Sequence, residues 1–262
     1  MSRLVSCIAL LLASTSPAYA KDFFTGTWKG DVKASQMSTK PSVTAIDKGI
    51  YTCSSCIPAV AIPADGAPHP VSGHSYYDAM TVTVVDPATV KYTTTMGGKP
   101  MSEATATVSA DGASLTTAFT DMTGANGMPV TGNTVSTRVA AGPAGSHAVS
   151  GSWRQTNDSQ ISDSGLVFTL VQSGRTLTYS TPTGTTYTAT MGGPAVAVKG
   201  DPGWTSVSLK RVSPATVIET DLLDGKVIGT YTMTVSLDRK KMTIAVNDIK
   251  YGKTSTLVAF KQ

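Results

Sequence analysis

The sequence predicts an all-β protein built from two tandem antiparallel up-and-down β-barrel-like domains. An internal repeat and a period-two pattern of apolar residues indicate this fold class. Residues 73–121 and 200–248 align without a gap at an offset of 127, with 17 of 49 positions identical. A repeat of this size exceeds the period of solenoid repeats and has the length of a whole domain. The chain therefore carries two copies of one domain.

Strand signals fill both copies. Met80, Val82 and Val84 alternate with polar residues, which places them on one face of a strand. The same alternation recurs in the second copy at Tyr231, Met233 and Val235. Turn signals such as Asp224-Gly225 separate the runs at hairpin spacing, and strands joined by short turns pair antiparallel. We expect about eight strands in each unit, the number of a small barrel, and no helix of three turns.

The first twenty residues have the features of a secretory signal peptide. Arg3 provides the positive charge, residues 4–13 form an apolar core, and Ala18-Tyr19-Ala20 is a small-residue cleavage site. The apolar core is too short to span a bilayer. We therefore expect cleavage after Ala20, a periplasmic or secreted mature protein, and no membrane span.

The domain boundaries follow from the repeat. Residues 21–140 form the first predicted β-barrel-like domain, which contains a Cys-x-x-Cys motif, and residues 148–262 form the second. Residues 141–147 are mostly small and are predicted to be a short linker. Each unit is long enough to bury a core of its own.

The charge balance excludes one class of partner. Removing Arg3 from the 21 basic residues leaves 20, against 17 acidic ones, so the mature chain has a small positive charge. The basic residues form no stripe interleaved with aromatic residues, which a nucleic-acid surface requires. We expect no nucleic-acid partner, and the sequence leaves the oligomeric state open.

Each copy begins with a Gly-x-Trp motif, Gly26-Thr27-Trp28 and Gly151-Ser152-Trp153. This pattern resembles the start of the lipocalins and other calycins, up-and-down barrels whose interior can hold a small apolar ligand. The resemblance implies that each tryptophan packs at the closed end of a barrel, beneath a basic residue from the last strand. Carried onto this chain, the barrel-closing pairs are Trp28 with Arg138 and Trp153 with Lys261.

The chain also looks like a group of uncharacterised secreted bacterial proteins built from one or two such units. The elements that carry this resemblance are Ala64-Asp65-Gly66, Val71-Ser72-Gly73, residues 78–84 and residues 107–112. No activity is attached to that group, so the resemblance bears on the fold alone.

Cys53 and Cys56 are the two cysteines that remain after the signal peptide, and His69 and His74 follow them. In an exported chain such a pair is most simply a disulfide, which we expect to pin a tight turn in the first domain. The spacing also fits a tetrahedral Cys2His2 zinc site, so metal binding or redox chemistry at these four residues is an alternative. The prolines beside the histidines disfavour the helix of a zinc finger. We expect no bound cofactor.

The sequence contains no pattern typical of a catalytic site. A Gly-x-Ser-x-Gly elbow is missing, and His74, Ser75 and Asp78 provide the residue types of a triad without any sign of its spatial arrangement. Asp221 and Asp224 flank a predicted hairpin turn, where aspartate is an ordinary residue. We therefore expect a non-enzymatic protein.

The function we expect is binding of a small apolar or amphipathic ligand, in a barrel interior or in the groove between the units. Methionine and aromatic residues on apolar strand faces suit such a cavity, although methionine also fills ordinary cores. The candidate lining residues are Met80, Val82, Tyr92, Met96, Tyr231, Met233 and Met242. The alternatives are metal or redox function at the cysteines and histidines, and a structural or interaction role in the cell envelope.

Overall fold

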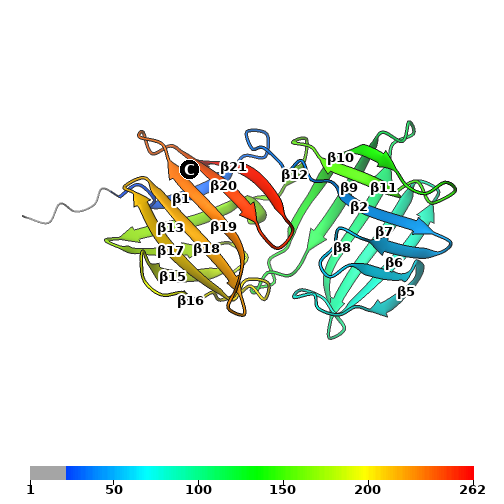
Figure 1. Ribbon diagram of the computed structural model, residues 1–262, viewed down its shortest axis with the longest axis horizontal. Helices are drawn as coiled ribbons and strands as arrows, with labels where there is room; N and C mark the ends of the chain where they lie inside the picture. Colours follow the sequence, from blue (N-terminus) through cyan, green and yellow to red (C-terminus); the bar gives the residue numbers. More distant parts are fainter. Residues whose placement is uncertain (1–21) are drawn as a thin grey trace, which may run out of the picture.

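The structure is a computed structural model that describes residues 22–262, and almost all of its regular structure is β-strand. Two barrel-like sheets lie side by side along the long axis of the molecule (Figure 1). The predicted signal peptide and its cleavage site lie outside the described residues. Within those residues the one helix, α1 (Asp163–Leu166), is a single turn, and no helix has the length and apolar character needed to cross a membrane.

The first barrel is an antiparallel sheet hydrogen-bonded in the order β4-β3-β2-β11-β10-β9-β8-β7-β6-β5. Its end strands β4 and β5 contact each other, so the sheet is nearly closed. A two-residue strand, β12 (Gln160–Ile161), pairs with β10 beside it. Its other strands are β2 (Ser42–Asp47), β3 (Ile50–Cys53), β4 (Val60–Pro63), β5 (Asp65–Pro70), β6 (Ala79–Asp86), β7 (Thr89–Met96), β8 (Lys99–Val108), β9 (Ser114–Asp121), β10 (Val130–Ala141) and β11 (Gly151–Gln155).

The second barrel is an antiparallel sheet in the order β15-β14-β13-β1-β21-β20-β19-β18-β17-β16. A bridge between Thr186 and Lys199 brings its two ends together. Its strands are β1 (Gly26–Gly30), β13 (Val167–Ser173), β14 (Thr176–Ser180), β15 (Thr186–Thr190), β16 (Val196–Ala197), β17 (Ser206–Ser213), β18 (Thr216–Leu223), β19 (Lys226–Val235), β20 (Lys241–Asp248) and β21 (Lys253–Lys261).

The repeat in the sequence is a repeat of strands. The bounds of β6 to β9 in the first barrel become those of β17 to β20 in the second when 127 is added to each residue number. None of these strands is interrupted by a helix. The prediction of two antiparallel barrel-like units is therefore confirmed.

The two Gly-x-Trp strands have exchanged places relative to the repeat. Strand β1, from the first copy, pairs with β13 and β21 of the second barrel. Strand β11, from the second copy, pairs with β2 and β10 of the first barrel. Residues 42–155 thus contain every strand of the first barrel's main sheet, and that barrel is inserted into the second, between β1 and β13.

This exchange corrects two expectations. The predicted linker, residues 141–147, consists of the last residue of β10 and part of the turn of the hairpin between β10 and β11. A short connection favours pairing of the two strands that it joins, so β11 closes the first barrel and β1 is left for the second. The predicted division at this segment therefore does not separate the two sheets.

The barrel-closing pairs change partners for the same reason. The guanidinium of Arg138 lies over the Trp153 ring, 4.1 Å from its centroid, and Lys261 Nζ lies 5.6 Å from that of Trp28. The pairs expected from the resemblance, Trp28 with Arg138 and Trp153 with Lys261, are wrong in this structure. The four predicted residues do form two cation–tryptophan pairs. Each cation lies on the strand that pairs with the exchanged Gly-x-Trp strand.

Each barrel has its own core around its tryptophan. Trp28 is fully buried, and its Nε1 donates to the Phe24 carbonyl over 2.9 Å. In the same way Trp153 Nε1 donates to the Val149 carbonyl over 2.8 Å. Because the buried indole N–H is satisfied locally, each ring can pack into an apolar barrel end without a desolvation penalty.

Candidate functional site

The first barrel has an open interior cavity of about 550 Å³. Small residues on β8, Ala104 and Ala106, leave space at its centre. Part of the wall is apolar or aromatic, from Tyr51, Met80, Tyr92, Leu115 and Trp153. The rest is polar, from Ser42, Thr44, Thr94, Ser102, Thr117, Thr134, Ser136 and Gln155. The cavity therefore offers both an apolar surface and many uncharged hydrogen-bonding groups.

Two tyrosines form the aromatic part of this cavity. The rings of Tyr51 and Tyr92 lie tilted against each other, with centroids 5.5 Å apart. Burial raises the pKa of both phenols far above the usual value, and the Tyr92 phenol raises that of Tyr51 further. Both phenols therefore stay neutral, so they can give or accept hydrogen bonds without adding charge to the cavity.

The mouth of the cavity carries the charged groups. Lys40, Asp248 and Lys253 lie there, the last two from the hairpin β20–β21 of the second barrel. Asp248 accepts a hydrogen bond from the Tyr251 backbone N–H over 3.0 Å, and Lys40 Nζ donates to the Tyr251 carbonyl over 2.6 Å. The mouth thus has two cations and one carboxylate, and the second barrel forms part of its rim.

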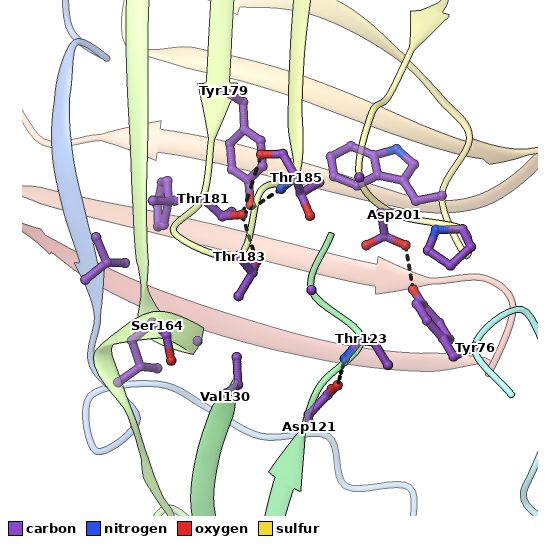
Figure 2. Close-up of a pocket in the computed structure, with 18 residues that line it drawn as sticks. Tyr76, Asp121, Thr123, Val130, Ser164, Tyr179, Thr181, Thr183, Thr185 and Asp201 are labelled. Carbon is purple, nitrogen blue, oxygen red and sulfur yellow. Dashed lines mark hydrogen bonds between the residues drawn. The ribbon is translucent and has the colours of Figure 1, made fainter. Parts of the chain in front are cut away.

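A second pocket, of about 340 Å³, lies between the barrels. Figure 2 shows it with Asp121 and Tyr76 on one side and Tyr179 and Asp201 on the other. Trp204 completes the aromatic wall. Among the described residues, Asp121 and Asp201 are the charged side chains of its lining, and no lysine, arginine or histidine joins them.

Tyr76 connects the two barrels across this pocket. It belongs to the loop between β5 and β6, and its hydroxyl donates to Asp201 Oδ1 over 2.7 Å (Figure 2). Its ring lies so close to Gly203 that a Cβ atom there would collide with it. A glycine at this position allows the tyrosine to reach the aspartate.

Two buried carboxyls lie in the second barrel beside this pocket. Glu219 and Asp221 are on the inward face of β18, with 8% and 5% of their surface exposed. The Tyr187 hydroxyl donates to Glu219 Oε2. Burial raises the pKa of both carboxyls, and for Asp221 the neighbouring Glu219 raises it further. The interpretation of Asp221 as an ordinary turn residue is therefore wrong, because the strand continues to Leu223.

The sequence held a signal for this pair. Val217, Glu219 and Asp221 alternate with Ile218 and Thr220, so their side chains had to share one face of a strand. The burial of that face is set by the closed sheet, which a single strand does not specify.

The cysteine and histidine cluster does not assemble as a metal site. Cys53 and Cys56 form the predicted disulfide, with an S–S distance of 2.08 Å. His69 Nε2 lies 2.9 Å from Asp65 Oδ1, and the His74 ring stacks on Tyr77. Across residues 22–262, no group of three or more histidine, cysteine, aspartate or glutamate side chains is arranged to hold a metal.

The predicted ligand-lining residues are divided between cavity and core. Met80 and Tyr92 line the first-barrel cavity. Val82, Met233 and Met242 are buried in the two cores, while Met96 and Tyr231 are partly buried and line neither the cavity nor the pocket between the barrels.

Comparison with known proteins gives no match: no family model, no curated protein and no solved structure is similar to this chain. Function is therefore inferred from the side chains of the two cavities.

Proposed function

We propose that this chain is a non-enzymatic, exported binding protein that holds a small amphipathic ligand in the first barrel. The observation that carries the proposal is the open cavity of about 550 Å³. Small-molecule sites have volumes of roughly 300–1,000 Å³, and because an unfilled interior costs stability, a retained cavity favours a binding role. The Gly-x-Trp motifs and the predicted signal peptide support an exported, lipocalin-like role.

The wall indicates the chemistry of the ligand. An apolar part would pack on Tyr92, Met80 and Trp153, while hydroxyl or carbonyl groups would bond the serine and threonine side chains of the facing strands. The two lysines at the mouth, against one aspartate, favour a ligand whose exposed end is negatively charged. Such a molecule would enter with its apolar end first.

The alternatives have less support. The cysteines are joined to each other and the histidines have other neighbours, so a metal or redox role has no assembled site in the described residues. A purely structural role gives no reason for an unfilled interior in one barrel only.

The test is a titration with 1-anilinonaphthalene-8-sulfonate, a fluorescent amphipathic anion. We expect saturable one-to-one binding with a rise in fluorescence. Replacement of Ala104 by phenylalanine places a ring in the cavity and should abolish the signal, because the added side chain occupies the ligand's volume. Mass spectrometry of protein purified under native conditions would then identify a ligand carried from the cell.

Thr107→Phe is the matched control, since Thr107 lies on the same strand and is exposed. It should bind the dye as the wild-type protein does. Equal binding by the Ala104→Phe protein, or no binding by the wild type, would leave a structural or interaction role instead.

A further inference from the structure

We propose that the pocket between the barrels is a second binding site, which takes a small organic ammonium ion. This site is separate from the first-barrel cavity and does not depend on the function proposed there. Its walls combine carboxylates with aromatic faces, and this combination recognises alkylated ammonium groups in proteins.

The charged side chains that line the pocket are both acidic. Asp121 comes from the end of β9 and Asp201 from the loop between β16 and β17, and none of the basic side chains of residues 22–262 lines the pocket. The Asp201 hydrogen bonds, from the Tyr76 hydroxyl and the Gly203 N–H, both end on Oδ1. In the part of the chain that the structure describes, Oδ2 of Asp201 accepts no hydrogen bond. This oxygen can therefore face a bound cation.

One wall of the pocket is aromatic. Phe168, Tyr179 and Trp204 line the pocket, and their ring centroids are separated by 6.1 Å between Phe168 and Tyr179 and 6.0 Å between Tyr179 and Trp204. Tyr187 stacks behind Tyr179, with centroids 5.2 Å apart. The negative faces of such rings attract a cation, most strongly where water is excluded.

A buried acidic side chain behind this wall adds a second observation. Asp221 is 5% exposed, and its Oδ1 has no hydrogen-bond partner among the described residues. The loop that carries Asp201 and Trp204 runs directly past it, because Thr205 N–H donates to the Leu222 carbonyl over 2.9 Å. An unpaired buried oxygen is costly, and a nearby cation would compensate for it.

An organic ion fits this pocket better than a bare metal ion. Calcium requires six to eight converging oxygen ligands, but no group of three metal-ligating side chains occurs among residues 22–262. A volume of about 340 Å³ with an aromatic wall suits an ion that has apolar groups around its charge.

Isothermal titration calorimetry with choline tests the proposal. The control ligand is 3,3-dimethylbutan-1-ol, which has the shape of choline with carbon in place of the charged nitrogen. We expect saturable one-to-one binding of choline, weakened by added salt, and binding of the neutral analogue weaker by about tenfold or more. Equal affinity for the two molecules, or no saturable binding of choline, would overturn the proposal.

A pair of variants locates the site. Asp201→Asn should weaken choline binding by about tenfold, since it removes a carboxylate beside the aromatic wall. Asp238→Asn removes a carboxylate from an exposed turn between β19 and β20, and it should bind choline as the wild type does. If both variants bind equally well, choline does not occupy this pocket. Dye binding in the first barrel should be the same in both, so the two proposals can fail separately.

Discussion

The two barrels have corresponding strands but differently filled interiors. The inward residues on β8 of the first barrel include Ala104 and Ala106. The aligned residues on β19 of the second barrel, 127 positions later, are Tyr231 and Met233. The first interior holds a cavity of about 550 Å³, whereas Met233 is 95% buried in a packed core, since only 5% of its surface is exposed. A few side-chain volumes therefore decide whether this sheet encloses a cavity.

The aligned strands also differ in the polar side chains that they turn inward. On β7 of the first barrel the aligned inward residues are Tyr92 and Thr94, and on β18 of the second they are Glu219 and Asp221. The first set gives neutral hydrogen-bonding groups and the second gives buried acids. One repeated scaffold thus carries two different sets of polar interior side chains.

The largest expected effect concerns the exchanged strands. A fragment of residues 38–162 contains the whole first barrel and should unfold cooperatively on heating. A fragment of residues 21–146, of nearly equal length, lacks β11 and the Ala148 and Ser150 carbonyls that bind Arg138, so it should show no cooperative transition. Circular dichroism during heating decides between them. If the fragment 21–146 is the more stable one, the first barrel closes with its own Gly-x-Trp strand.

The next prediction exchanges one side chain between the barrels. Met233→Ala should lower the free energy of unfolding by about 2–5 kcal/mol, because it leaves a cavity in a packed core. Ala106→Met, at the aligned position, places the larger side chain beside an existing cavity and should change stability by less than about 1.5 kcal/mol. Urea denaturation measures both. Equal losses would mean that the first-barrel interior has no room for the larger side chain.

The third prediction compares how much the two cations that lie over the tryptophans, Arg138 and Lys261, contribute to stability. Arg138 donates to the carbonyls of Gly112, Ala148 and Ser150 and covers Trp153, whereas Lys261 lies over Trp28 at the greater distance of 5.6 Å. Arg138→Met should cost about 2–4 kcal/mol, because it leaves partly buried carbonyls without donors. Lys261→Met should cost about 1 kcal/mol or less. Urea denaturation compares the two variants, and a larger loss for Lys261→Met would contradict this ranking.

The smallest expected effect is a dependence on pH that the two buried acids of the second barrel should cause. The pKa values of Glu219 and Asp221 are raised from their ordinary values of 4.5 and 3.8, so the native state keeps protons that the unfolded chain releases. Their contribution to stability is complete below those ordinary values and is lost as pH rises through the raised ones. Between about pH 5 and pH 8 the free energy of unfolding should fall by about 1–2 kcal/mol.

Glu219→Gln should flatten this slope, since the amide does not titrate. Asp111→Asn, in an exposed turn of the first barrel, is the control and should leave the slope unchanged. Thermal unfolding at a series of pH values gives the comparison. A slope that is the same in Glu219→Gln and the wild type would place the dependence elsewhere.

The sequence was a good guide wherever structure is local. Alternation of apolar residues and short turns predicted the antiparallel strands, and the ungapped repeat predicted that β6 to β9 and β17 to β20 correspond. The bond between Cys53 and Cys56 was also expected, because they are the two cysteines left in a chain with a predicted export signal. All of these depend on residues close together in the chain, where the geometry of the backbone leaves few choices.

What the sequence by itself determined is two copies of a strand pattern, each with a Gly-x-Trp motif, and the resemblance added a cation for each tryptophan. Only the tertiary structure decided which tryptophan meets which cation, because β1 and β11 carry the same motif and can fill the same place in either sheet. The tertiary structure also decided the size and lining of the two cavities. Their volume depends on side chains such as Ala104, Tyr76 and Asp221, which come from distant strands and loops and meet only when the barrels close.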